Sequence, residues 1–395
     1  MRFGTTRATL MLLAPIHALA KSNKLDSVSF QADIKTDNLL LNLEALNDIS
    51  FDSGGNRAFG LPGYNASADY IYKRVSEVKN AEVRRQYFTV ISASVNFIDL
   101  RVDDKPIHIS GLTYSPSTSG EGITAEIALG PEGAAGCDAS SYGDLDVKGK
   151  IVLVQRFSCP NSDTLAGRVM AGAAAGASAV IFYHDLSTNV TGGSLSSGSS
   201  LILELFIALS NYKTENRIRF AWWGAEEKGL LGSTFYTSNL AITDVNDLLV
   251  YLNFDMVGNG YFGVADTDGS SYGSKAPKGS EATEKIFADY FTSQGIETTP
   301  VALTNGSDYA SFWQNLNKPF GFLHTGTGVE QDPCYHQACD TIDNVNSKTL
   351  TINAKAAAHI LATLDERGSK LIPKTKVTDT TLHSLQQRSV GTHLG

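Results

Sequence analysis

Two short apolar segments of the chain end in acidic residues, and this feature most constrains the fold. The segment IRFAWWGAEE ends in Glu226 and Glu227, and the segment VYLNFDMVG carries Asp255. A short, continuously apolar run is typical of a buried strand in a parallel sheet. Because ligands collect at the carboxyl ends of such strands, we expect the three carboxylates to lie at one edge of a sheet.

Helical patterns surround these two segments. Apolar residues recur at helical spacing in 36–48, and a Gly/Pro-rich turn precedes a helix from about residue 67. The sequence RRQYFTV is a predicted strand, and four further helices are predicted in LILELFIALSNY, EATEKIFADYFTSQG, SDYASFWQNL with Ser307 as N-cap, and NSKTLTINAKAAAHILATLDER. The alternation predicts an α/β fold, with a mixed, mainly parallel sheet and helices on both faces.

Charge and composition limit the classes of partner. The 395 residues leave room for two compact domains, and 42% hydrophobic with 18% charged residues is typical of a globular protein. The net charge is -9, and clustered Lys and Arg are lacking, so a phosphate-binding surface is disfavoured. We expect no nucleic-acid partner and a monomer.

The first 20 residues, MRFGTTRATLMLLAPIHALA, combine two arginines, a short apolar run and a small-x-small ending. This pattern predicts a secretory signal peptide and an extracellular mature protein. The apolar run is shorter than the ~18 residues that a membrane span needs, and no later segment reaches that length, so we expect no membrane insertion. Glycosylation sequons at Asn65, Asn189 and Asn305 fit the secretory route.

Four cysteines permit three pairings. In a secreted chain we expect two disulfides, Cys334–Cys339 and Cys137–Cys159, with free buried thiols as the alternative. Metal binding by the Cys334 and Cys339 pair is disfavoured, because His336 between them leaves no tetrahedral arrangement. The bridge would instead hold the loop around His336 rigid, as a metal ligand requires.

The middle of the chain, 95–196, is rich in glycine and poor in charge. Predicted strands in KGKIVLVQR and SAVIFYHD flank an Ala/Gly-rich helix that Gly176 is placed to end. The block from GCDASSYG to VIFYHD resembles the protease-associated domain, a small β-rich module inserted in many secreted peptidases. The resemblance implies contacts with substrates or other proteins and no catalytic group.

A neighbouring pair of acids such as Glu226 and Glu227 is commonly a partner of a helix dipole, and a lone loop histidine is commonly a hydrogen-bonding residue. The presence of Asp255 favours another interpretation. Three carboxylates at two strand ends repel one another unless a cation lies between them. The sequence therefore predicts a metal site.

The motifs AWWGAEEKGLLGS, NFDMVG and DPCYHQACDTIDN are similar to those of the secreted two-zinc aminopeptidases of fungi and streptomycetes, and the similarity covers most of 36–365. It implies a zinc-exopeptidase-like fold and peptide substrates with a free N-terminus. By this resemblance Glu226 is the general base and Glu227 binds one zinc together with His336.

The same resemblance assigns Asp255 to the second zinc and Tyr335 to the oxyanion that forms on the scissile carbonyl. The family also has a His-x-Asp strand and a zinc-bridging Asp just before a Gly-Ser-Gly helix start. Here NVTGGSLS runs almost directly into the buried helix, and neither element is found. His184 and Asp185 are poor substitutes, because they are adjacent and end a strand of the inserted module. We expect one zinc or none, held weakly by Glu227 and His336 with help from Asp255, because two zincs without the bridge repel each other.

An absent interior strand leaves backbone groups without partners. Either the sheet closes up with other strands, or residues near 191–200 reflect a skipped exon. Two functions follow: a secreted zinc aminopeptidase, or a catalytically impaired glycoprotein of the same fold that acts as a binding module. A two-carboxylate glycosidase is disfavoured, because its acids face each other across a sugar.

The predicted organisation has five parts: a signal peptide over 1–20, the N-terminal part of a peptidase domain over 21–94, the protease-associated domain over 95–196, the rest of the peptidase domain over 197–366, and a disordered tail over 367–395.

Overall fold

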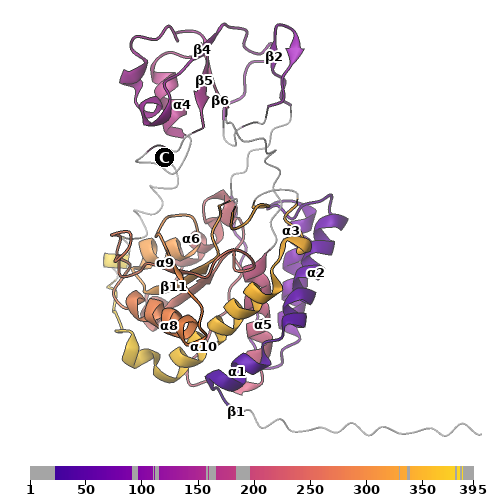
Figure 1. Cartoon of the computed structure of the whole chain (residues 1–395), viewed down its shortest axis with the longest axis vertical. Coiled ribbons are helices and arrows are strands. Elements are labelled where there is room, and N and C mark those ends of the chain that lie inside the picture. The colour runs from indigo at the N-terminus through magenta and orange to yellow at the C-terminus, as the bar shows by residue number, and fades with distance from the viewer. Residues whose placement is uncertain are drawn as a thin grey trace, which may run out of the picture. The chain divides into compact units, whose positions relative to one another are not determined.

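The computed structural model describes residues 23–395, apart from 91–96, 110, 112–114, 157–158, 160–165, 184–195, 329, 336–338, 379, 383–384 and 386–395. The chain forms two compact units (Figure 1). The larger unit comprises the described parts of 1–85 and 192–395, and the smaller unit those of 86–191.

A four-stranded sheet forms the centre of the larger unit. Its strand order is β10 (Thr299–Val301), β9 (Gly263–Ala265), β11 (Phe320–His324) and β8 (Tyr251–Phe254). The pairs β10–β9 and β11–β8 are parallel, whereas β11 and β9 are antiparallel. A separate parallel pair joins β1 (Asn23–Lys24) to β7 (Tyr212–Lys213). The predicted α/β class with a mixed, mainly parallel sheet is confirmed.

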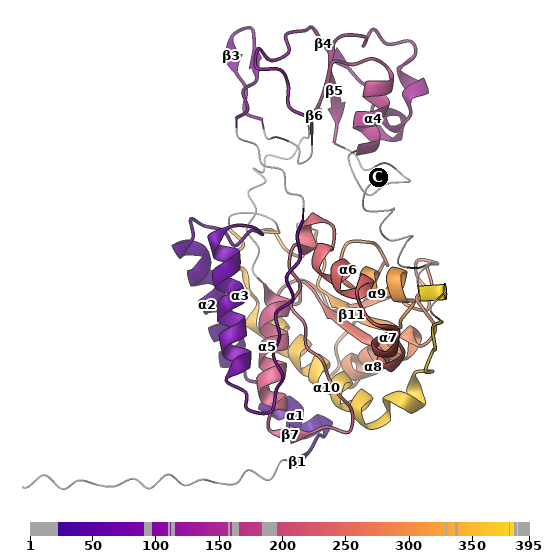
Figure 2. The same cartoon turned by 180° about the vertical axis from the view of Figure 1, so that it is seen from behind.

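Helices cover both faces of this sheet. They are α1 (Ser27–Asp33), α2 (Thr36–Asp52), α3 (Pro62–Ser76), α5 (Ser197–Leu209), α6 (Leu231–Ser238), α7 (Ile242–Asp247), α8 (Ser280–Ser293), α9 (Tyr309–Leu316) and α10 (Ser347–Leu371). Both views show β11 between α9 and α10 (Figures 1 and 2).

Alternation along β11 explains how both faces are filled. Phe320 and Phe322 point toward α9, where their rings lie 4.7 and 4.9 Å from that of Tyr309. Leu323 points the other way, into a core that it shares with Phe287 of α8 and the buried alanines of α10. Successive side chains of a strand point to opposite faces, so one apolar strand contributes to both layers.

The smaller unit is built around a three-stranded parallel sheet, in which β5 (Ile151–Gln155) lies between β4 (Ile127–Leu129) and β6 (Ala179–Tyr183). Helix α4 (Ala166–Ala174) packs on it, and Gly176 follows that helix with φ +90°. A hairpin joins β2 (Arg101–Val102) to β3 (Lys105–Pro106). The disulfide Cys137–Cys159 lies in this unit, as predicted.

Two predicted strands differ from the structure. Residues 84–90 and 218–223 belong to no strand of the described sheets, and β8 is the last strand of its sheet. A strand exists only where a neighbour pairs with its backbone, so an apolar run without such a neighbour stays irregular. Among the described residues, no other strand pairs with the free edge of β8.

The start of α9 and the end of the chain also differ from expectation. The N-cap of α9 is Asp308, so the prediction of Ser307 at that position is wrong. Helix α10 continues to Leu371, past the predicted domain end. Beyond it, Val377 exchanges hydrogen bonds of 2.7 and 3.2 Å with Asn246, and Leu382 is buried. This part of the expected disordered tail packs on the larger unit.

Helix α5 meets β8 at the carboxyl end of the strand. The hydroxyl of Ser197 accepts the backbone N–H of Val257 at 3.0 Å. At Gly198 a methyl group would lie inside the contact distance of the Phe254 carbonyl oxygen. The absence of a side chain at Gly198 is what allows this close approach. Within the described residues, a helix long and apolar enough to span a bilayer is absent.

We predict that Gly198→Ala destabilises the larger unit by about 1–3 kcal/mol, because α5 must move away from the Phe254 carbonyl. The midpoint of urea unfolding, followed by tryptophan fluorescence, measures this. Gly120→Ala is the matched control, since no atom lies within 4 Å of a methyl group there. Equal midpoints for the two variants would contradict the packing described.

Candidate metal centre

Glu226 and Glu227 lie in a short 3-10 turn, Glu226–Lys228, that follows the irregular segment 218–223 and precedes α6. Ala225, just before the turn, has a left-handed backbone with φ 56°. Glu226 is half-buried, whereas Glu227 is exposed. The two neighbouring carboxylates therefore have different surroundings, as the sequence predicts.

Asp255 directly follows β8. The next residue, Met256, is also left-handed, with φ 50°. Its carbonyl oxygen accepts hydrogen bonds from the backbone N–H and the hydroxyl of Thr325, at 2.8 and 2.6 Å. A left-handed non-glycine residue costs about 1–3 kcal/mol and persists only where its surroundings hold it. The two bonds to Met256 supply that support beside the candidate ligand.

The three predicted acids interact electrostatically. Burial, together with the charges of Asp255, Glu227 and Asp308, raises the pKa of Glu226 to about 9. Like charges act in this way only when they are close, because screening weakens distant ones. The structure thus brings Glu226, Glu227 and Asp255 together and adds Asp308 to the group.

Asp308 was not singled out from the sequence. It precedes α9 and is 8% exposed, and burial raises its pKa to about 7. The hydroxyl of Ser233 acts against this rise, whereas the charge of Asp255 adds to it. Its Oδ1 has no hydrogen-bond partner among the described residues. A buried carboxylate oxygen without a hydrogen-bond partner indicates a polar site. The sequence could not show this, because the tertiary structure brings Asp308 close to Asp255.

The loop that carries Tyr335 is closed by the predicted disulfide Cys334–Cys339. Burial raises the pKa of Tyr335 to about 12, and the charges of Glu227, Asp255 and Glu226 contribute. Tyr335 therefore lies near the carboxylates. His336, the predicted ligand next to it, lies outside the described residues.

His324, at the end of β11, is a second residue that sequence reasoning missed. Its Nδ1 lies 2.8 Å from the backbone N–H of Gly326 and accepts its hydrogen. The ring proton of the neutral imidazole is then on Nε2, and a protonated nitrogen cannot bind a metal. Burial lowers the pKa of His324, while Asp255 acts to raise it.

The donor set suits a divalent cation. Glu227 and Asp255 offer carboxylate oxygens, which zinc accepts as ligands. Burial and the charges of the neighbouring acids raise the pKa of Glu226, and a cation would offset the repulsion among these charges. The orphaned Oδ1 of Asp308 is part of the same electronegative surroundings.

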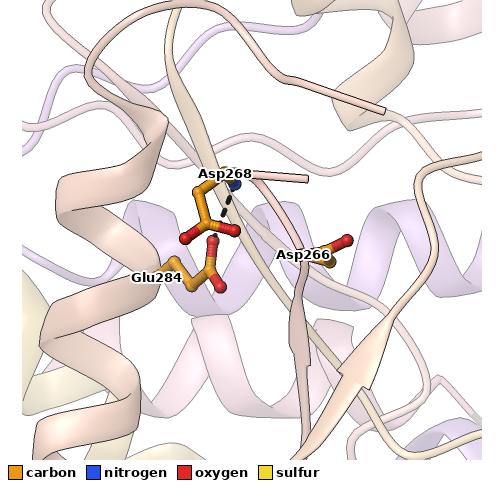
Figure 3. A group of neighbouring side chains, drawn as sticks. All are labelled: Asp266, Asp268 and Glu284. Carbon is orange, nitrogen blue, oxygen red and sulfur yellow. Dashed lines mark hydrogen bonds between the residues drawn. The ribbon is translucent and has the colours of Figure 1, made fainter. Parts of the chain in front are cut away.

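Another acidic group lies beyond β9. Asp266, Asp268 and Glu284 have oxygens within 4.8 Å of one another (Figure 3). Glu284 accepts the backbone N–H groups of Thr267 and Asp268, and Asp266 accepts that of Tyr272 at 2.7 Å. These bonds fold the loop after β9 onto α8, so the structural role accounts for the three acids.

The remaining predicted sites divide between exposed and undescribed positions. Asn65 and Asn305 are exposed. Asn189, His184 and Asp185 lie outside the described residues, as does the predicted signal peptide over 1–20.

Two parts of the chain match known families. Residues 195–361 match peptidase family M28, and residues 123–209 match the PA domain. These matches identify the chain as a peptide hydrolase with an inserted PA domain. The resemblance to zinc aminopeptidases with a protease-associated module is thus confirmed.

Similar proteins cover most of the chain. It is 28% identical to a leucine aminopeptidase 2 of Arthroderma otae, over 87% of this chain and 88% of the relative. It is 27% identical to a probable leucine aminopeptidase 2 of Aspergillus oryzae, over 92% of each chain. BSAP, a zinc aminopeptidase from Bacillus subtilis, has the same fold, with a TM-score of 0.66, 19% identity, and coverage of 88% of this chain and 98% of BSAP.

We predict that Glu226→Gln stabilises the metal-free chain at pH 8. The pKa of Glu226 is raised from 4.5 to about 9, so between these values the folded state keeps a proton that the unfolded state releases. The free energy of unfolding therefore falls as the pH rises between these two pKa values. The neutral glutamine removes this loss, which we expect to amount to about 1–2 kcal/mol.

Thermal unfolding in chelator at pH 8 and at pH 4 measures this effect. The variant should melt above the wild type at pH 8 and level with it at pH 4. A control, Glu215→Gln, changes an exposed acid that pairs with Lys24 at 2.8 Å and should not gain stability. Equal melting temperatures of Glu226→Gln and wild type at pH 8 would contradict the raised pKa of Glu226.

Proposed function

We propose that this chain is a secreted, zinc-dependent aminopeptidase that hydrolyses the N-terminal residue of peptides. The observation that carries the proposal is the mutual electrostatic interaction of Glu226, Glu227, Asp255 and Tyr335, which come from three separate segments. The names of the relatives, leucine aminopeptidase among them, support the same reaction. Glu227, Asp255 and His336 are the proposed zinc ligands.

Zinc, when bound, polarises the scissile carbonyl and makes a water molecule acidic. Glu226 is the proposed general base that takes the proton from that water. Its half-buried position among other acids keeps it a strong base, and a neighbouring cation keeps it ionised. The phenol of Tyr335 is protonated at neutral pH, since its pKa is about 12, and is the proposed donor to the oxyanion.

The acid-rich surroundings also define the substrate class. A free peptide N-terminus is an ammonium group, and carboxylates such as Glu227 and Asp308 attract it, whereas a blocked N-terminus carries no charge to attract. A monomer, cleavage of a signal peptide after residue 20, and glycosylation at Asn65, Asn189 and Asn305 complete the proposal.

The number of zinc ions is part of the proposal. The alignment with the Arthroderma relative has 447 positions, although 87% of 395 residues is about 344, so about a hundred positions hold no residue of this chain. The PA and M28 matches overlap at 195–209, which leaves no residues between them. We therefore propose that the segment with the first histidine and the bridging acid is absent, and that one zinc at most is bound.

This absence also favours a second candidate function. In this alternative the chain keeps the fold, lacks the ligands for two zincs, and acts as a binding module rather than as an enzyme. Residues 218–223 support this alternative. The sequence predicts a strand there, but the segment is irregular in the structure. We propose that the strand that would pair with it belongs to the absent part of the chain.

We predict that the purified chain hydrolyses leucyl-p-nitroanilide, that chelator abolishes the activity, and that zinc restores it. Glu226→Gln should lower kcat by about 10²–10⁴-fold, because the general base is lost while the carboxamide keeps the shape of the side chain. The control Glu215→Gln should retain the wild-type rate. Release of p-nitroaniline, measured at several zinc concentrations, gives both values.

Metal counting by mass spectrometry on the same preparations separates the two functions. One zinc per chain with hydrolysis supports the one-zinc enzyme. A folded chain that stays inactive with zinc supplied supports the binding module. Two tightly held zincs would refute the proposed absence of the ligand-bearing segment.

A further inference from the structure

We propose that a chain of four hydrogen bonds, running from Trp223 through Tyr251, Asn253 and Ser307 to Asp255, orients the Asp255 carboxylate for metal binding. Ser307 is its last link and thus a positioning residue. The inference rests on the proposed role of Asp255 as a zinc ligand. The chain of hydrogen bonds connects Trp223 of the first acidic motif, AWWGAEE, to Asp255 of the second, NFDMVG.

The geometry of the links is uniform. The indole Nε1–H of Trp223 donates to the Tyr251 hydroxyl at 3.0 Å, and that hydroxyl donates to Asn253 Oδ1 at 2.9 Å. Asn253 Nδ2 donates to the Ser307 hydroxyl at 2.9 Å. The Ser307 hydroxyl donates to Asp255 Oδ2 at 2.6 Å. All four distances are normal or short for bonds of their type, and the shortest ends on the carboxylate.

The direction of the chain is fixed by its first member. An indole N–H can only donate, so the Tyr251 hydroxyl accepts there and has its single proton left for Asn253. The amide then turns its NH₂ group toward Ser307, whose proton is left for Asp255. Hydrogen bonds aligned in one direction polarise one another, so the last donor is stronger than an isolated serine.

Burial keeps the members in place and away from competing water. Asn253 and Ser307 are 4% and 3% exposed. The ring of Tyr251 stacks on Phe312 of α9, with centroids 3.8 Å apart and planes 5° apart. Burial raises the pKa of Tyr251 well above its usual value, so its hydroxyl stays a donor. Packing thus leaves each member little freedom to turn out of the chain.

The chain explains why Ser307 does not cap α9. Its hydroxyl is directed at Asp255 instead of the first helical N–H groups, and Asp308 takes the N-cap position. Asn253 and Asp255 are two residues apart, so both side chains lie on the same face at the end of β8, toward α9. A metal ligand held by a second layer of hydrogen bonds loses less freedom when the ion binds.

The test is the zinc affinity of the purified full chain, measured by competition with a chromophoric chelator. Ser307→Ala should weaken zinc binding by about 10–100-fold, and Ser307→Thr, which keeps a hydroxyl, should restore most of it. Ser311→Ala is the matched control. Ser311 is also 3% exposed and lies on α9, but its hydroxyl pairs with Ser233 at 2.8 Å and with Thr234 at 3.0 Å.

A second variant breaks the chain farther from the carboxylate. Tyr251→Phe keeps the ring on Phe312 and removes only the hydroxyl, so we expect a smaller loss of zinc affinity than for Ser307→Ala. Tyr236→Phe is its control, because Tyr236 packs in the same aromatic cluster, with its ring 4.9 Å from that of Trp223, and is not a link of the chain. In metal-free protein, the indole proton resonance of Trp223 should shift in Tyr251→Phe and not in Tyr236→Phe.

The outcomes separate this proposal from the proposed function. If wild type binds zinc and Ser307→Ala binds it equally well, the positioning role is refuted and the aminopeptidase proposal stands. An unchanged Trp223 indole resonance in Tyr251→Phe also refutes the chain of bonds. If wild type binds no zinc and hydrolyses no substrate, the proposed function fails, and the role of Ser307 in metal binding fails with it.

Discussion

The parallel pairing of β8 with β11 is the constraint on which the site depends. Its register, from Phe320 beside Tyr251 to Leu323 beside Phe254, brings the carboxyl ends of both strands to one place. Asp255 follows one strand and His324 ends the other. Two hydrogen bonds from Thr325 to the Met256 carbonyl oxygen join the two segments just after the last residue pair of the strands. Each side-chain interaction of Asp255 requires this backbone arrangement.

Carboxylates gathered at one sheet edge oppose folding, and the larger unit must offset them. Burial and mutual repulsion raise the pKa values of Glu226 and Asp308 to about 9 and about 7, and Ala225 and Met256 are held left-handed beside them. Strain and unfavourable charge concentrated in one place are typical of functional sites. The apolar core shared by α5, α8 and α10 supplies the opposing free energy.

Local patterns predicted much of this structure. Helices α5 and α10, strand β8 and both disulfides follow from apolar spacing, capping residues and cysteine positions, which are properties of neighbouring residues. The contact of Ser307 could not be predicted, because its partner Asp255 lies 52 residues away in the sequence. The role of His324 could not be predicted either, because the hydrogen bond from Gly326 determines which ring nitrogen carries the proton. The strand predicted at 218–223 also failed for a tertiary reason, since pairing needs a neighbour that the described sheet lacks.

The proposed absence of a strand beside β8 would affect only one side of the candidate site. The ladder from β10 to β8 is intact, and with it Asp255 and the hydrogen bonds through Ser307 that come from β8 and the start of α9. On the other side of β8 no further strand of the described sheet is hydrogen-bonded to it. Glu226 and Glu227 follow an irregular segment there, and the turn at Ala225 and the start of α6 hold them in place. The elements that hold Asp255 thus do not depend on the segment that we propose to be absent. This arrangement is the structural basis of the proposal that one zinc at most binds, beside β8.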